Sequence, residues 1–121
     1  TLRGLHYQQE PFYEKKLVRA ISGRAFDVAV DMRPGPTFGQ WRSIELSAER
    51  MNAIFIPEGF AHGFLALEPH TTLLYQMSPA FLVGHGMGIR WNDPDIAIDW
   101  PAQPHIISRA DDRLPFLRDL F

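Results

Sequence analysis

The sequence contains no cysteine among its 121 residues. Disulfide bonds and thiolate chemistry are therefore excluded, and a reducing compartment, the cytoplasm, is the expected location. No apolar run approaches the roughly 18 residues that a membrane-spanning helix needs, and the first residues lack the pattern of a signal peptide. Lys and Arg are scattered and the net charge is -2, so neither nucleic acid nor a membrane surface is an expected partner.

Several catalytic motifs are also missing. No glycine-rich phosphate loop leads into a helix and no Gly-x-Ser-x-Gly is present, so nucleophilic catalysis by serine has no support. The five histidines form no His-x-His pair, and His6 is followed by Tyr7 and Gln8. Glutamine is a poor metal ligand, and we therefore expect no catalytic metal.

The chain does contain many turn-forming residues. Nine glycines and ten prolines lie between short apolar runs, which is typical of an all-β domain. The content of 45% hydrophobic and 21% charged residues is that of an ordinary globular protein. No linker is long enough to divide the chain, so we expect a single domain over residues 1–121.

Alternation of apolar and polar side chains predicts about seven short strands. We expect them at residues 2–8, 15–21, 24–31, 39–46, 52–56, 62–67 and 71–76. Ser108 is predicted to cap one or two helical turns that end before Pro115. Short strands with tight turns and no long helical period favour an all-β sandwich or barrel, and a jelly roll is the best single prediction.

Two histidines stand in extended segments near glycine. His6 follows Gly4, and His62 precedes Gly63. Glycine beside a strand residue permits close approach of another backbone or a ligand, so both histidines are candidate site residues. The alternative is structural, with His6 at the surface or in the core and His62 hydrogen-bonded in a turn. The remaining histidines are expected to be solvated in loops: His70, His85 and His105.

Three further side chains are candidates from their place in predicted strands. Asp27 lies on the small-residue face of its strand, which suits a barrel interior that holds a ligand, although it would equally suit solvent. Lys16 alternates in phase with apolar neighbours, and we expect it to meet Asp27 across a strand pair. Tyr75 ends an apolar run; it either packs and hydrogen-bonds as most strand tyrosines do, or acts as an acid.

The order of these segments resembles the dTDP-4-dehydrorhamnose 3,5-epimerase family of cupin-like jelly rolls. The matching runs are LRGLHYQ at 2–8, KLVR at 16–19, FDVAVD at 26–31, PTFGQW at 36–41, ELSAE at 45–49, IPEGFAHGF at 56–64, LY at 74–75 and IRWNDP at 89–94. The resemblance implies an all-β, cupin-like jelly-roll barrel with a short C-terminal helical segment. It also implies a homodimer.

The resemblance further implies a cofactor-independent, metal-free isomerase of deoxysugar biosynthesis, which epimerises a dTDP-4-keto-6-deoxy sugar at C3, C5 or both. It assigns His6 as the general base, Asp111 as the carboxylate that orients it, and Tyr75 as the acid on the opposite sugar face. Lys16 is assigned to the C4 oxygen. The substrate-binding residues are expected to be Arg3, His62, Asp27 and Phe81, with Phe81 stacked on thymine.

The chain departs from the family pattern at three places. The given sequence starts at the LRGLH run, and we expect the segment that usually precedes it to be lacking. Residues 78–87 have neither the usual Tyr-Tyr pair nor the usual acidic residue and carry Ala80 and Gly86 instead of polar groups. Ala110 replaces a usual lysine beside Arg109. Three alternatives therefore stay open: an epimerase-like binding module, a paralogue without turnover, and a related cupin ketoisomerase or single-carbon epimerase.

Overall fold

The computed structural model describes residues 1–8, 15–78 and 86–120. Its strands are β1 (Leu2–Gln8), β2 (Lys15–Ser22), β3 (Arg24–Asp31), β4 (Trp41–Ser47), β5 (Ala53–Ile56), β6 (Phe60–Ala66), β7 (Thr72–Ser78) and β8 (Gly86–Gly88). One α-helical turn, α1 (Arg109–Asp112), and one 3-10 turn, η1 (Leu117–Asp119), follow near the C-terminus. All seven predicted strands are present with slightly shifted ends, and no helix of the described residues is long and apolar enough to cross a membrane.

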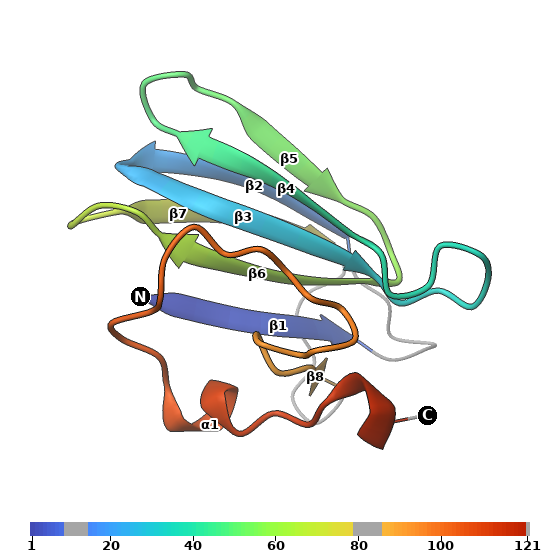
Figure 1. The fold of residues 1–121 in the computed structure, drawn as a ribbon. Helices are drawn as coiled ribbons and strands as arrows, with labels where there is room; N and C mark the ends of the chain where they lie inside the picture. The colour runs from blue at the N-terminus through green and yellow to red at the C-terminus, as the bar shows by residue number, and fades with distance from the viewer. Residues whose placement is uncertain (9–14, 79–85, 121) are drawn as a thin grey trace.

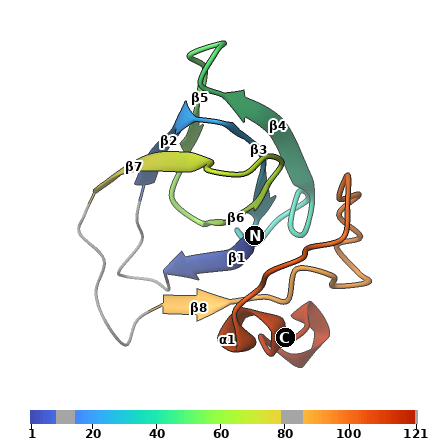
Figure 2. The same cartoon turned by 90° about the vertical axis from the view of Figure 1, so that its left-hand side faces the viewer.

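The strands form two antiparallel sheets. The larger has the order β4-β3-β6-β1-β8 and the smaller the order β5-β2-β7. Figure 2 shows the two sheets curving round a common interior, as expected for a jelly-roll barrel. Because β2 and β3 belong to different sheets, the expectation that Lys16 and Asp27 meet across a strand pair is wrong. The tight Ser22–Gly23 turn joins two strands that part into opposite sheets instead of pairing.

Both faces of β3 are buried, and they contact different parts of the protein. One face turns into the barrel, where Ala29 packs with Val18 and Leu46 in the interior core. The opposite face carries Val28 and Val30, which pack in a second core with residues from the C-terminal segment. Figure 1 shows this orange and red segment crossing the outside of the sheet near β6 and β1.

The C-terminal segment is anchored to the sheet by backbone contacts and two caps. The N–H of Leu2 donates to the carbonyl of Ile106 at 2.8 Å. The buried carboxylate of Asp93 accepts the N–H groups of Asp95, Ile96 and Leu117. The Ser108 hydroxyl accepts the N–H of Asp111 at 3.0 Å, which confirms the predicted N-cap of α1. These contacts bring α1 against β1, although more than a hundred residues separate them in sequence.

Candidate active site

A β-bulge in β1 sets the direction of the two most reactive side chains on that strand. Arg3 pairs with Phe64 and His6 with His62, so three residue steps on β1 match two steps on β6. In an unbroken strand, Arg3 and His6 would face opposite sides of the sheet because side chains alternate. The bulge turns both toward the barrel interior, as bulges beside functional sites commonly do.

Gly4 makes this bulge possible. Its φ is +117°, and a Cβ at this position would lie 2.6 Å from Cα of Gly63 on the neighbouring strand. Only glycine combines that backbone angle with so close an approach. The predicted role of glycine beside the two histidines, close approach of another backbone, is therefore confirmed for Gly4 and Gly63.

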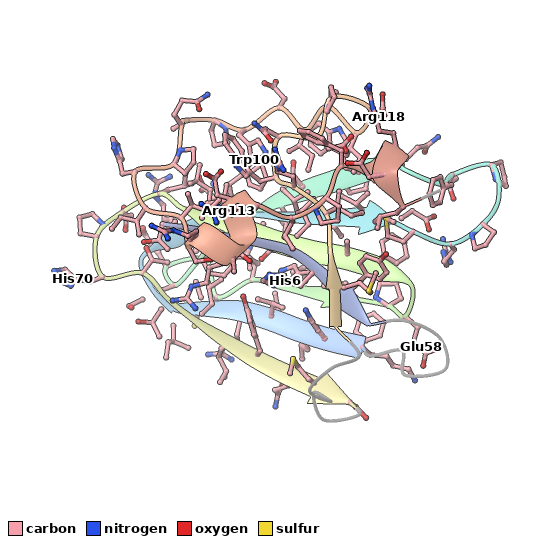
Figure 3. The ribbon with its side chains drawn as sticks, turned by 90° about the horizontal axis from the view of Figure 1, so that it is seen from below. His6, Glu58, His70, Trp100, Arg113 and Arg118 are labelled. Carbon is pink, nitrogen blue, oxygen red and sulfur yellow. The ribbon has the colours of Figure 1, made fainter. Side chains whose placement is uncertain are left out.

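His6 is paired with Asp111 of α1. Nε2 of His6 lies 2.7 Å from Oδ1 of Asp111, while Oδ2 accepts the N–H of Gly4 at 3.2 Å. The side chain of His6 is 49% exposed and that of Asp111 only 11%. Figure 3 shows His6 beside the ribbon of α1, viewed from below. A buried carboxylate thus holds one ring nitrogen of an accessible histidine.

A second histidine–carboxylate pair lies deeper in the barrel. Nε2 of His62 lies 2.9 and 2.8 Å from the two carboxylate oxygens of Asp27. The side chains are 3% and 0% exposed, respectively. The interpretation of Asp27 as a solvent-facing residue is therefore wrong, and the interpretation of its strand face as interior is confirmed. The two residues come from neighbouring strands, since Ala29 pairs with His62 in the β3–β6 ladder.

Tyr75 enters the same interior from the opposite sheet. It pairs with the buried Val18 in the β2–β7 ladder, and its ring meets the ring of His62 edge-on at 5.6 Å. Burial first, and then the negative charge of Asp27, raise the pKa of the Tyr75 phenol above its usual value of 10.0, while Arg3 opposes this. Tyr75 is therefore in its neutral, proton-donating form near pH 7.

Lys16 lies on the interior face of the same small sheet. Its register partners are Ile56 on β5 and Met77 on β7, and it alternates in phase with the fully buried Val18. The lysine itself is buried. Its neighbour Lys15 points outward and is exposed. A buried ammonium in the barrel is an unusual placement, since lysine is rarely buried without a functional or electrostatic reason.

A cavity of about 650 Å³ adjoins this cluster. Of the predicted site residues, Arg3 and Tyr75 line it, together with Phe64, while His6, Lys16, His62, Asp27 and Asp111 do not. Sequence reasoning missed Phe64 and the loop 67–71 that forms the rim. The strand register supplies a signal for Phe64, because it pairs directly with Arg3. His70 and His105 are exposed as predicted, but both also line the cavity.

Phe81 and His85 lie outside the described residues. Within residues 1–8, 15–78 and 86–120, no group of three or more His, Cys, Asp or Glu side chains is placed to hold a metal ion. The reactive groups that the structure brings together are thus two histidine–carboxylate pairs, a tyrosine, a lysine and an arginine.

An antiparallel barrel of this topology, with titratable side chains gathered at and beside its interior, is a cupin-like jelly roll. The model of the dTDP-4-dehydrorhamnose 3,5-epimerase family matches residues 1–119, and the chain belongs to this family. A dTDP-4-dehydrorhamnose 3,5-epimerase from Sinorhizobium fredii is 45% identical over 99% of the chain. The chain spans 63% of the length of that relative.

Solved structures show the same fold. An epimerase of this name from Bacillus anthracis, with TDP and PPi bound, superposes with a TM-score of 0.93 at 43% identity, over 97% of this chain and 67% of that one. The enzyme from Legionella pneumophila, in complex with dTDP-4-keto-L-rhamnose, gives a TM-score of 0.91 at 40% identity, over 97% of this chain and 63% of that one. The predicted all-β, cupin-like class is confirmed.

Proposed function

We propose that the protein is a cofactor-independent isomerase that epimerises a dTDP-4-keto-6-deoxy sugar at C3, C5 or both, in dTDP-rhamnose or related deoxysugar biosynthesis. The observation that carries this proposal is the 2.7 Å contact between the accessible His6 and the buried Asp111. Tyr75 comes from the sheet that faces β1. A base and an acid on facing sheets can act on the two faces of one sugar ring.

His6 is the base in this proposal. Asp111 accepts a hydrogen bond from Nε2–H of His6, so the neutral ring carries its lone pair on Nδ1. No hydrogen bond to Nδ1 is found in the described part of the chain. A C–H next to the 4-keto group is acidic because its loss gives an enolate, and Nδ1 would take that proton. Asp111 stabilises the imidazolium that results, as the carboxylate does in other histidine–carboxylate pairs.

Lys16 and Tyr75 complete the proton transfer. Negative charge develops on the C4 oxygen as the proton leaves, and the ammonium of Lys16 would stabilise it in the interior of the barrel. Tyr75 would then donate its phenol proton to the carbon from the other face, which inverts the configuration. The raised pKa of Tyr75 keeps that proton in place until the enolate forms. Solvent afterwards returns a proton to the phenolate and takes the abstracted proton from the imidazolium of His6.

The cavity and Arg3 support binding of the nucleotide part. A volume of about 650 Å³ lies in the range of pockets that hold small molecules. Arg3 contributes a guanidinium, which pairs well with phosphate oxygens. The stacking of thymine on Phe81 and the contact of His62 with the sugar are retained as parts of this proposal.

Proton exchange in deuterated water is the direct test. The protein is incubated with dTDP-4-keto-6-deoxyglucose, and deuterium at C3 and C5 is followed by NMR together with the epimerised product. Exchange at either carbon is expected, and His6→Ala should abolish it. Absence of exchange from the unmodified protein would rule out epimerisation. Calorimetry with dTDP then separates a binding module, which binds without turnover, from a paralogue that does neither.

We also infer a homodimer. The outer face of the small sheet carries exposed apolar side chains from all three strands: Leu17, Ile21, Phe55 and Leu74. Phe55 pairs directly with Leu17, so the two side chains stand together on the surface. A contiguous exposed apolar face supports burial against a partner, and a second copy is the simplest partner. A monomer in sedimentation at high concentration would contradict this.

The cytoplasm is the proposed location. The sequence has no cysteine, and therefore none of the disulfide bonds that are common in proteins of oxidising compartments. Fractionation of cells that express the protein, with detection by antibody, tests this assignment. Recovery in an extracellular or membrane fraction would overturn it.

A further inference from the structure

Asp27 is placed differently from a residue that contacts a substrate. Its side chain has no exposed surface, and both carboxylate oxygens lie within 2.9 Å of Nε2 of His62. Asp27 is also absent from the lining of the cavity that Arg3 and Tyr75 share. The carboxylate is therefore committed to His62, in the way that the carboxylate of Asp111 is committed to His6.

His62 contacts both Asp27 and Tyr75 and thereby connects them. Because Asp27 accepts the Nε2–H of His62, the imidazole plane has a fixed orientation. The ring of Tyr75 meets that plane edge-on, at 5.6 Å between centroids and 78° between planes. Such edge-to-face contacts are favourable and directional. The Tyr75 hydroxyl has no hydrogen-bond partner among the residues that the structure describes, so its ring contacts with His62 and Phe64 hold it in place.

The charge of Asp27 also links this carboxylate with Tyr75. The negative charge of Asp27 disfavours a phenolate at Tyr75, whereas the cationic Arg3 favours it. A phenolate would be unable to donate a proton to an enolate. The buried carboxylate thus adds to the preference for the neutral phenol, which is the form that an acid needs.

We propose that Asp27 is a positioning residue for the acid step, acting through His62 on Tyr75. This inference rests on the proposed epimerase function. The two histidine–carboxylate pairs then have separate tasks. The pair of His6 and Asp111 serves proton removal from one face, and the pair of His62 and Asp27 serves proton delivery from the other.

The first test is the ratio of solvent exchange to epimerised product, measured with dTDP-4-keto-6-deoxyglucose in deuterated water. Loss of a well-placed acid should reduce product about 10-fold to 100-fold. For Asp27→Asn we expect this loss of product. The rate of solvent exchange should stay within about threefold of that of the unmodified protein, because His6 and Asp111 are unchanged. Tyr75→Phe should show the same pattern more strongly. An unchanged ratio in Asp27→Asn would overturn the proposal.

Asp31→Asn is the matched control. Asp31 lies on the same strand and is also a buried carboxylate, but it binds Arg33 and Thr37 and, among the residues that the structure describes, forms no hydrogen bond or ion pair with either histidine. Its amide variant should keep the ratio of the unmodified protein, at a temperature where both are folded. A rise in the ratio for Asp31→Asn equal to that for Asp27→Asn would mean that the effect is only structural, and it would overturn the proposal.

The second test needs no turnover. NMR of ring-labelled tyrosine, assigned with Tyr75→Phe, follows the titration of the Tyr75 phenol. Removing the charge of Asp27 should lower that pKa toward 10.0, and an unchanged titration would overturn the coupling. This measurement decides the role of Asp27 even if the unmodified protein shows no exchange, in which case only the proposed epimerase function fails.

His62→Gln covers the possibility that Asp27→Asn does not fold. The glutamine amide can replace Nε2–H as a donor to Asp27 but supplies no ring for Tyr75. We therefore expect a raised exchange-to-product ratio together with a phenol pKa that stays raised. A normal ratio in this variant would show that His62 does not connect Asp27 with the acid step, and it would overturn the proposal.

Discussion

His6 and Asp111 are separated by 105 residues in sequence, yet Nε2 of His6 lies 2.7 Å from a carboxylate oxygen of Asp111. The contact depends on the bulge at Gly4, since the other oxygen of the same carboxylate accepts the Gly4 N–H. In a regular ladder that N–H would be directed at a neighbouring strand. The irregularity in β1 therefore both directs His6 and binds the carboxylate that contacts it.

Replacing Asp111 should impair proton removal. In Asp111→Asn the carboxylate charge that stabilises the imidazolium is lost, and we expect exchange and epimerisation to fall together, by about 100-fold or more. Deuterium incorporation followed by NMR measures this. Asp112→Asn is the control, because Asp112 is exposed and, within the described part of the chain, its carboxylate accepts only from Nε1–H of Trp91. Equal losses in both variants would contradict the assigned role.

Lys16 and Lys15 are neighbours on β2, one buried and one exposed, so that Lys15 can serve as the control for Lys16. Lys16→Met removes the buried cation near the proposed enolate, and it should lower exchange and epimerisation together by about 100-fold. Lys15→Met changes an outward lysine that lies 3.9 Å from Glu58, and it should leave both rates nearly unchanged. The same NMR assay measures both. If Lys16→Met retained full exchange, stabilisation of the enolate would have to come from another group.

Gly4→Ala should destabilise the fold and disturb the site. A Cβ at Gly4 would lie 2.6 Å from Cα of Gly63 and 2.8 Å from the carbonyl oxygen of His62, at a φ of +117°. Backbone strain alone costs about 1–3 kcal/mol, and the clash adds to it. Gly35→Ala isolates the strain, because Gly35 has a φ of +139° and a Cβ there would meet no other described residue within 4 Å. Chemical denaturation should show a larger loss for Gly4→Ala, and equal losses would contradict the close approach.

Asp31 gives the fold a defined sensitivity to acid. Hydrogen bonds from Arg33 lower the pKa of this carboxyl from 3.8 to about 2, with a further contribution from Thr37. A carboxyl whose pKa is lower in the folded state contributes stability above its unfolded pKa, and this contribution is lost as pH falls from about 4 to about 2. Because Arg33 is largely exposed, screening limits the contribution to about 1–2 kcal/mol.

The Asp31 prediction is measured by denaturation at two pH values. Asp31→Asn should be less stable than the unmodified protein near neutral pH, and the difference should shrink as pH approaches about 2. Asp95→Asn is the control, since the pair of Asp95 with Arg118 is exposed on both sides and contributes little. A constant difference across the pH range would show that the carboxylate charge of Asp31 is not the cause.

The strands were predictable because each carries its own signal. In 24–31, the bulky side chains of Phe26, Val28 and Val30 alternate with smaller or charged ones, and turn residues flank the segment. The cap at Ser108 is likewise local, since a hydroxyl needs only the N–H three residues later. The short η1 was not foreseen. Its start combines a local contact, in which Asp119 accepts the Phe116 N–H, with a distant one, in which Asp93 accepts the Leu117 N–H.

The candidate site likewise combines residues that the sequence indicated with contacts that it did not. Sequence reasoning selected His6, Tyr75, Lys16 and Asp27, and the residues themselves placed Asp27 on a potential interior face. It wrongly paired Lys16 with Asp27, because a short turn between two strands usually makes a hairpin. Here the two strands enter opposite sheets. No local pattern indicates that β2 prefers β5 and β7, since that choice depends on which apolar faces can be buried together.

The amino-acid pattern alone accounts for the alternation of strands and turns, the reactive side chains available, and the glycines that permit a bulge and a close strand contact. Those properties are local, because they follow from the period of the strand and the conformational range of single residues. The contact of Asp111 with His6, and that of Asp27 with His62 beside Tyr75, arise from the folding of the whole chain. These contacts join distant segments, and burial of two cores on either side of one sheet brings them together.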